Sequence, residues 1–208
     1  MQTKGPRQTS VVAALGLLAI VVSFAAQPVF AQAGETPIDL NSPENLLYLD
    51  LPAGRVVIRM RPDKAPDHVA RIKELTRRNF YDGLIFHRVI EGFMAQTGDP
   101  TGTGTGNSSL PDLEAEFNDL MHLRGTVSMA RTEDPDSANS QFFIMFQPRS
   151  SLDGNYTVWG RVIRGMEHVD AIARGEPPAD PTQIVRMRVA ADVLDKTETS
   201  RETGDGGS

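Results

Sequence analysis

The sequence predicts a single, mainly β domain that forms a closed barrel or a sandwich. Most of its apolar residues fall in short, strand-like runs, and only two stretches have helical spacing. Because the strands do not alternate regularly with helices, a parallel α/β sheet is not expected. A chain of 208 residues can hold one domain with a sizeable core, so two full domains are not expected either.

The first part of this domain is expected to be a hairpin followed by a helix. Residues 46–51 and 55–60 are apolar and strand-like, and the Pro-Ala-Gly segment 52–54 between them forms the turn. Residues 62–78 fit a helix, because prolines mark its entry and Asp67 lies near its positive end. Apolar residues at helical spacing give this helix one buried face.

The middle of the chain combines strands with a long loop. The turn at residues 81–83 leads into strands within residues 86–96. Residues 98–110 are rich in glycine, threonine and serine and show no apolar period. We expect a surface loop there that is long enough to carry function.

Further strands and a second helix complete the predicted domain. Residues 166–174 have apolar positions at helical spacing, and apolar residues alternate with arginines in residues 184–194, as in a half-buried strand. The other short strand candidates are 125–129, 141–146 and 157–163.

The N-terminus has the pattern of a secretory signal peptide over residues 1–31. Two basic residues precede a nearly unbroken apolar run at 11–26, and small residues allow cleavage after Ala31 or Ala33. The apolar run is shorter than the roughly 20 residues of a membrane span, so a permanent anchor is not favoured. The mature protein is expected to be exported, periplasmic or secreted, and not attached to the membrane.

The remaining boundaries follow from composition. Residues 32–44 are expected to be a flexible leader, and residues 45–195 the folded domain. Residues 196–208 are polar and end in glycine and serine, so we expect a disordered tail.

Charge and cysteine content exclude several classes of partner and site. Without Lys4 and Arg7, the 21 basic residues fall to 19 against 27 acidic ones, so the net charge moves from −6 to −8. An acidic surface argues against nucleic acid or anionic lipid as partners. The absence of cysteine excludes disulfides and thiolate zinc sites, and the histidines lack metal-binding spacing.

Residues 86–96 carry the most informative motif. Arg88 stands between two apolar runs and is followed by two large apolar residues and an amide, Gln96. Residues 140–144 repeat the mixture of amide and aromatic groups, with Gln141 as the amide. On residue types alone, the arginine could be a surface ion-pair residue and the aromatic residues core. Two glutamines would be costly in a core without partners, so a pocket is favoured.

Four blocks of the sequence, in order and spacing, resemble the cyclophilins, which are peptidyl-prolyl cis-trans isomerases. The blocks are 86–99, 125–130, 140–144 and 152–154, within a similarity that runs from about Leu46 to about Leu194. The resemblance implies a closed eight-stranded antiparallel β-barrel capped by two α-helices, with the site on the barrel's outer face. It also implies an enzyme that works without a cofactor. Together with the signal-peptide pattern it indicates a member of the bacterial exported type, and a monomer is expected.

The same resemblance implies a substrate class and site residues. The substrates would be proline-containing peptides and unfolded proteins, whose X-Pro bonds are rotated to assist folding after export. Arg88 resembles the catalytic arginine. The proline-pocket walls are expected from Phe93, Met94, Phe143 and Leu152, the backbone-holding amides from Gln96 and Gln141, and the adjoining groove from Ala130, Arg131 and Tyr156.

Three positions depart from the best-known eukaryotic pattern. Arg131 stands where asparagine is usual, and its side chain can only donate hydrogen bonds, whereas an amide also accepts them. Tyr156 stands where histidine is frequent and keeps an aromatic wall. Ser151 stands where the family often has a tryptophan associated with tight cyclosporin binding, so weak cyclosporin sensitivity is predicted.

Two other functions are alternatives to isomerisation. A binding module that holds proline-bearing segments with little turnover would keep its peptide affinity while its isomerisation was negligible. A hydrolase is less favoured, because no Gly-x-Ser-x-Gly motif is present. The glycines at 102–106 suggest a phosphate cradle only superficially, since the Lys-Ser/Thr pair and a following helix are missing.

Overall fold

The structure is a computed structural model that describes residues 1–2 and 38–194. Apart from its first two residues, the expected signal peptide lies outside the described residues. So do residues 32–37 of the expected leader and the expected tail at 196–208.

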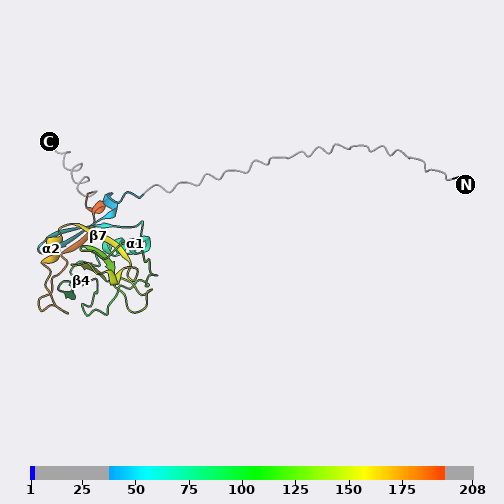
Figure 1. The fold of residues 1–208 in the computed structure, drawn as a ribbon. Helices are drawn as coiled ribbons and strands as arrows, with labels where there is room; N and C mark the ends of the chain where they lie inside the picture. The colour runs from blue at the N-terminus through cyan, green and yellow to red at the C-terminus, as the bar shows by residue number, and fades with distance from the viewer. Residues whose placement is uncertain (3–37, 195–208) are drawn as a thin grey trace, which may run out of the picture. The chain divides into compact units, whose positions relative to one another are not determined.

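Eight antiparallel strands form one curled sheet, a half-barrel, in the order β3-β4-β6-β5-β7-β2-β1-β8 (Figure 1). The strands are β1 (Leu46–Leu51), β2 (Gly54–Met60), β3 (Arg88–Ile90), β4 (Met94–Thr97), β5 (Thr126–Met129), β6 (Phe142–Met145), β7 (Val158–Arg164) and β8 (Arg186–Val189). The mainly β, eight-stranded architecture is therefore confirmed.

The expected closure of the barrel is not confirmed. Within the described ranges, the edge strands β3 and β8 do not pair with each other. The free edge of the short strand β3 instead pairs at Val89 with Gly175, and Ile85 pairs with Gln183. The connection between α2 and β8 thus lies where a closing strand pair would be.

Two α-helices accompany the sheet, α1 (Pro66–Arg77) and α2 (Met166–Asp170), together with the 3-10 turns η1 (Pro43–Asn45) and η2 (Ser150–Leu152). Helix α1 packs against β8 and α2 against β2, and Figure 1 shows the two helices flanking the sheet. No helix in the described ranges has the length and apolar character needed to cross a membrane.

Helix α1 starts later than residue 62, and its first turn is held from a distant loop. Pro66 occupies the first helical position, where its missing N–H costs nothing. The carboxylate of Glu116 accepts hydrogen bonds from the backbone N–H groups of Asp67 (3.1 Å) and His68 (3.0 Å). A negative group there satisfies free donors and complements the positive end of the helix.

Two predicted elements are shorter than expected. Helix α2 ends at Asp170 instead of residue 174, because the Arg174 side chain folds back and donates to the carbonyls of Asp170 and Ile172. Strand β8 ends at Val189, and residues 190–194 are helical instead of extended, so the strand predicted over 184–194 was wrong in its second half.

The buried apolar residues form two clusters on opposite faces of the sheet. The larger cluster fills the inside of the half-barrel and includes Trp159, Tyr81, Phe86 and Phe142. The smaller cluster is built on Met94, Phe143 and Met145 of β4 and β6. Because side chains alternate along a strand, neighbouring residues such as Phe142 and Phe143 serve different clusters.

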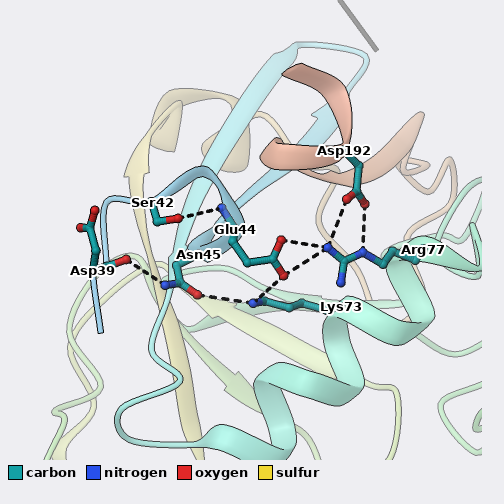
Figure 2. A network of polar contacts seen from close by, with 7 residues as sticks. All are labelled: Asp39, Ser42, Glu44, Asn45, Lys73, Arg77 and Asp192. Atoms are coloured by element: carbon teal, nitrogen blue, oxygen red, sulfur yellow. Dashed lines mark hydrogen bonds and ion pairs between the residues drawn. The ribbon is translucent and has the colours of Figure 1, made fainter. Parts of the chain in front are cut away.

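A group of ion pairs, here called the terminal network, joins the two ends of the described domain to α1 (Figure 2). Arg77 of α1 contacts Glu44 of η1 at 2.9 Å and Asp192 of the C-terminal helical segment at 3.1 Å. Lys73 also reaches Glu44, at 3.0 Å. The other residues shown are Asp39, Ser42 and Asn45, which hydrogen-bond within the segment that precedes β1, and Asn45 also accepts a hydrogen bond from Lys73 at 3.4 Å.

Candidate active site

The outer face of the sheet carries a cavity of about 240 Å³. It is lined by every residue that the sequence assigns to the site except Gln141. The lining residues are His87, Arg88, Phe93, Met94, Gln96, Gly104, Ala130, Arg131, Phe143, Leu152 and Tyr156. Positions up to 69 residues apart in the chain, His87 and Tyr156, therefore meet at one place.

Strand register explains why these side chains meet. Arg88 of β3 lies opposite Gln96 of β4, which lies opposite Phe143 of β6, which lies opposite Ser128 of β5. Residues directly opposite each other on antiparallel strands share a face of the sheet. The adjacent row, which runs from Val89 through Ile144, belongs to the inner core, so one register sets both the core and the site.

The cavity floor and walls are apolar and aromatic. Met94 and Phe143 are almost fully buried in the smaller cluster, and Tyr156 meets the Phe143 ring edge-on at 5.7 Å between centroids. The Arg149 guanidinium lies 4.9 Å above the Phe93 ring, a cation–π arrangement that holds this wall. The arrangement can receive a compact apolar ring while it excludes water from one side of that ring.

Arg88 stands at this cavity with most of its donors available. Its Nε donates to the Glu176 carboxylate at 2.8 Å, and the side chains of both residues are about half exposed. Among the described residues, this is the only hydrogen bond made by the Arg88 side chain. The two terminal nitrogens of the guanidinium are thus available to a bound molecule.

The two predicted amides are coupled to each other, but only one lines the main cavity. Gln96 Nε2 donates to Gln141 Oε1 at 2.9 Å. Gln141 Nε2 in turn donates to the carbonyls of Gly104 (3.2 Å) and Gly106 (2.8 Å), so its donors hold the glycine-rich loop. Both amides line a second cavity of about 220 Å³, which also borders on Arg131.

The loop that brings Gly104 to the cavity is organised by Asp99. Its carboxylate accepts hydrogen bonds from the Thr101 hydroxyl (2.8 Å) and from the backbone N–H groups of Thr101 (2.7 Å), Thr103 (3.0 Å) and Gly104 (2.6 Å). Burial alone would raise the pKa of Asp99, but the hydrogen bonds from Thr101, Gly106 and Gly104 outweigh burial and lower the pKa to about 2. The region is a loop, as predicted, and Asp99 holds its backbone at Thr101, Thr103 and Gly104.

All three side-chain nitrogens of Arg131 donate hydrogen bonds to backbone carbonyls of the protein. Its Nε and Nη2 donate to the Asn155 carbonyl at 3.1 and 2.9 Å, and its Nη1 donates to the Thr132 carbonyl at 2.8 Å. The guanidinium also lies 4.7 Å above the Tyr156 ring. Its side chain therefore braces the cavity rim around Tyr156.

A buried Ser-His-Asp array beneath the cavity was missed from the sequence. His122 Nδ1 lies 2.9 Å from Asp153 Oδ1, and its Nε2 lies 2.9 Å from Ser128 Oγ. Ser128 and His122 are at most 1% exposed, and neither lines the cavity. Burial lowers the pKa of His122 and outweighs the opposing effect of Asp153, so the ring is neutral at pH 7.

This array supports the cavity wall instead of acting as a nucleophile. The His122 ring stacks on Phe143 at 6.2 Å between centroids and meets Tyr156 edge-on at 6.4 Å. No linear sequence motif predicts the array, because His122 and Asp153 are 31 residues apart.

His87, interpreted from the sequence as structural, is buried and borders the cavity. Burial is the main reason why its pKa is lowered. Within the described part of the chain, no group of three or more His, Cys, Asp or Glu residues could hold a metal ion.

Known proteins resemble this chain in sequence. The profile of the family described as cyclophilin type peptidyl-prolyl cis-trans isomerase/CLD matches residues 46–189. A probable peptidyl-prolyl cis-trans isomerase of Brucella suis is 48% identical over 166 residues, which cover 72% of this chain and 85% of that protein.

Two crystal structures resemble the fold. One is cyclophilin AquaCyp293 from Hirschia baltica, with a TM-score of 0.67 and 31% identity over 72% of this chain and 75% of that one. The other is a Cryptosporidium parvum cyclophilin type peptidyl-prolyl cis-trans isomerase in the presence of the dipeptide Ala-Pro. It has a TM-score of 0.66 and 28% identity over 69% of this chain and 98% of that one.

Proposed function

The chain belongs to the cyclophilin-type peptidyl-prolyl cis-trans isomerases, and on that premise we propose that the outer-face cavity is its active site and Arg88 its catalytic residue. The family's reaction is rotation about X-Pro peptide bonds, and this chain is an enzyme of that class. One observation supports the assignment of the site: a half-exposed arginine with free terminal donors lies at the edge of an apolar cavity.

The proposed role of Arg88 follows from the chemistry of the amide. Rotation about a peptide bond has a barrier of roughly 18–20 kcal/mol because it breaks resonance. In the twisted transition state the prolyl nitrogen becomes pyramidal and regains a lone pair. A guanidinium N–H that donates to this nitrogen opposes the return to planarity. Arginine suits this role because it stays charged and its donors are rigidly placed.

The cavity contributes the remaining stabilisation of the transition state. Phe93, Met94, Phe143 and Leu152 would hold the proline ring while the preceding carbonyl turns, and Gln96 would hold the substrate backbone. A thousandfold acceleration requires about 4 kcal/mol of preference for the twisted state. One charge-assisted hydrogen bond of about 1.5–3 kcal/mol does not supply all of this, so the apolar walls must share it.

The proposed site is tested by following the cis-to-trans conversion of a short proline peptide, by NMR exchange and by a protease-coupled assay. We expect the wild-type domain to accelerate the conversion and Arg88→Ala to lose most of that acceleration. Circular dichroism on both proteins checks that the fold is kept. Equal rates for the two folded proteins would remove Arg88 from its proposed role.

We further propose that the enzyme is of the bacterial exported type and assists folding of extended or unfolded polypeptides after export. The support is the signal-peptide pattern of residues 1–31 and the departure of Ser151 and Tyr156 from the best-known eukaryotic pattern. N-terminal sequencing of the protein recovered from its producing cells tests this proposal. A first residue of Gln32 or Gly34 is expected, whereas an intact N-terminus on cytoplasmic protein would contradict export.

Ser151 gives a further expectation, weak cyclosporin sensitivity. The residue lies in η2, next to Leu152 of the cavity wall. Ser151→Trp restores the side chain associated with tight cyclosporin binding in the family. Titration calorimetry should show tighter binding to the variant than to the wild type, and equal affinities would contradict this role of position 151.

A further inference from the structure

The segment after α2 is fixed beside β3 by its backbone. Val89 N–H donates to the Gly175 carbonyl at 2.8 Å, and Gly175 N–H donates to the Val89 carbonyl at 2.9 Å, in an antiparallel bridge. In this register Glu176 stands directly opposite Arg88, and facing residues on antiparallel strands share a side. The carboxylate therefore reaches Arg88 because the backbone places it there.

Two ion pairs flank this bridge. In one the arginine is on β3, and in the other it is on the segment after α2. Glu176 accepts from Arg88 Nε at 2.8 Å, and Arg174 Nε donates to Glu91 at 2.6 Å. Gly175 lies between them with a φ of +145°, and a Cβ there would come within 2.5 Å of Pro178. This conformation suits glycine, because the chain folds back toward Pro178 directly after Gly175 while Glu176 faces Arg88.

The contact with Glu176 constrains the guanidinium in a specific way. The Nε–H and both terminal nitrogens lie in one plane, so a partner on Nε fixes the direction of the other donors. Without it, an exposed arginine side chain samples several rotamers, and only some of these would aim a terminal N–H into the cavity. The carboxylate binds on the side of Arg88 that leaves both terminal nitrogens free.

We propose that Glu176 is a positioning residue for the isomerase reaction, which orients the guanidinium of Arg88 toward the bound prolyl nitrogen. This inference depends on the proposed function of Arg88. Glu176 would contribute by orienting Arg88, because Arg88 lines the cavity and Glu176 does not. The effect should therefore fall on kcat more than on KM, because orientation matters most in the transition state.

The test compares Glu176→Ala and Glu176→Gln with the matched control Glu91→Ala. The control breaks the other ion pair of the same segment without touching Arg88. An exposed ion pair supports an effect of up to about 5-fold. We expect Glu176→Ala to lower kcat about 3- to 5-fold with KM within about 2-fold of wild type. Glu176→Gln should recover much of this loss because its carbonyl oxygen can still accept from Nε.

The Nε–H resonance of Arg88, measured by heteronuclear NMR, reports the contact without any activity measurement. It should shift in Glu176→Ala and stay unchanged in Glu91→Ala. Three results would overturn the inference: full activity of Glu176→Ala, an equal loss in Glu91→Ala, or a loss confined to KM. Arg88→Ala belongs in the same series. If it is inactive while Glu176→Ala is fully active, only the inference on Glu176 fails; if it is as active as wild type, the proposed function of Arg88 fails.

Discussion

Arg77 in the terminal network and Arg88 at the cavity are almost equally exposed, with side chains 44% and 43% accessible. Their partners differ. Arg77 makes four hydrogen bonds to two carboxylates, those of Glu44 and Asp192, and uses Nε and Nη2 (Figure 2). Arg88 makes one, to Glu176.

The difference matches the two roles that we propose for these arginines. At Arg77 the charge is matched by carboxylates from two separate segments, which ties the ends of the domain to α1. At Arg88 the protein fixes one nitrogen and leaves the terminal donors free. Exposure alone does not separate the two roles, but the number of hydrogen bonds each arginine makes does.

The largest expected effect is the loss of isomerase activity in Arg88→Ala. Arg88→Ala should lower kcat/KM by roughly 10- to 100-fold, since it removes a charge-assisted hydrogen bond of about 1.5–3 kcal/mol from the transition state. Its free energy of unfolding should change by less than about 0.5 kcal/mol, as for an exposed residue with one ion pair. Isomerase kinetics and urea unfolding on the same protein samples measure both quantities.

The same two measurements on Arg77→Ala supply the control. If this variant also lost isomerase activity while remaining folded, the division between a structural and a catalytic arginine would be wrong.

Asp99 shows the reverse arrangement to Arg77, because here a single carboxylate accepts several hydrogen bonds and so holds the loop beside the cavity. Its pKa is lowered from 3.8 to about 2 in the folded protein. A lowered folded-state pKa gives stability that is present above pH 4 and is lost as the pH falls toward 2. The shift corresponds to about 2 kcal/mol.

Urea unfolding of wild type and Asp99→Asn between pH 6 and pH 2 checks this expectation. The stability advantage of the wild type should shrink toward acid pH. An advantage that stays constant across this range would show that the carboxylate charge is not what organises the loop.

The smallest effect is expected at the terminal network itself. Arg77→Ala should lower the free energy of unfolding by about 1 kcal/mol, because exposed ion pairs contribute about 0.2–1 kcal/mol each. High salt should weaken the wild type toward the variant, since these charges are accessible to solvent. Urea unfolding at low and high salt measures this, and a salt-independent difference would point to packing of the arginine stem instead.

Much of the fold follows from local pattern. The hairpin of β1 and β2 and the central strands follow from alternation and turn residues, and α1 from its apolar spacing. Residues 190–194 were mispredicted because alternation in Arg186–Val189 suggests that the strand continues, whereas the alanines at 190 and 191 favour helix and Asp192 meets Arg77. Whether the barrel closes depends on contacts between distant edges, which no local pattern encodes.

The site residues were proposed from motif resemblance, and the structure brings all of them except Gln141 to one cavity. Residues that only contact a site residue carry no motif of their own and cannot be predicted in this way. Glu176 is 88 residues from Arg88 and lies in a Pro/Gly-rich segment with no periodic signal. The array of His122, Ser128 and Asp153 likewise depends on register and loop placement.

The Ser-His-Asp array has a practical consequence for how this enzyme is detected. Searches that match only the geometry of a catalytic triad would flag it as a serine hydrolase. Fluorophosphonate reagents, which label accessible nucleophilic serines, should leave the native protein unmodified because Ser128 is fully buried in β5, opposite Phe143 of β6. Unfolded protein should stay unlabelled too, because opening the sheet separates Ser128 from His122 and so removes the base that a nucleophilic serine needs.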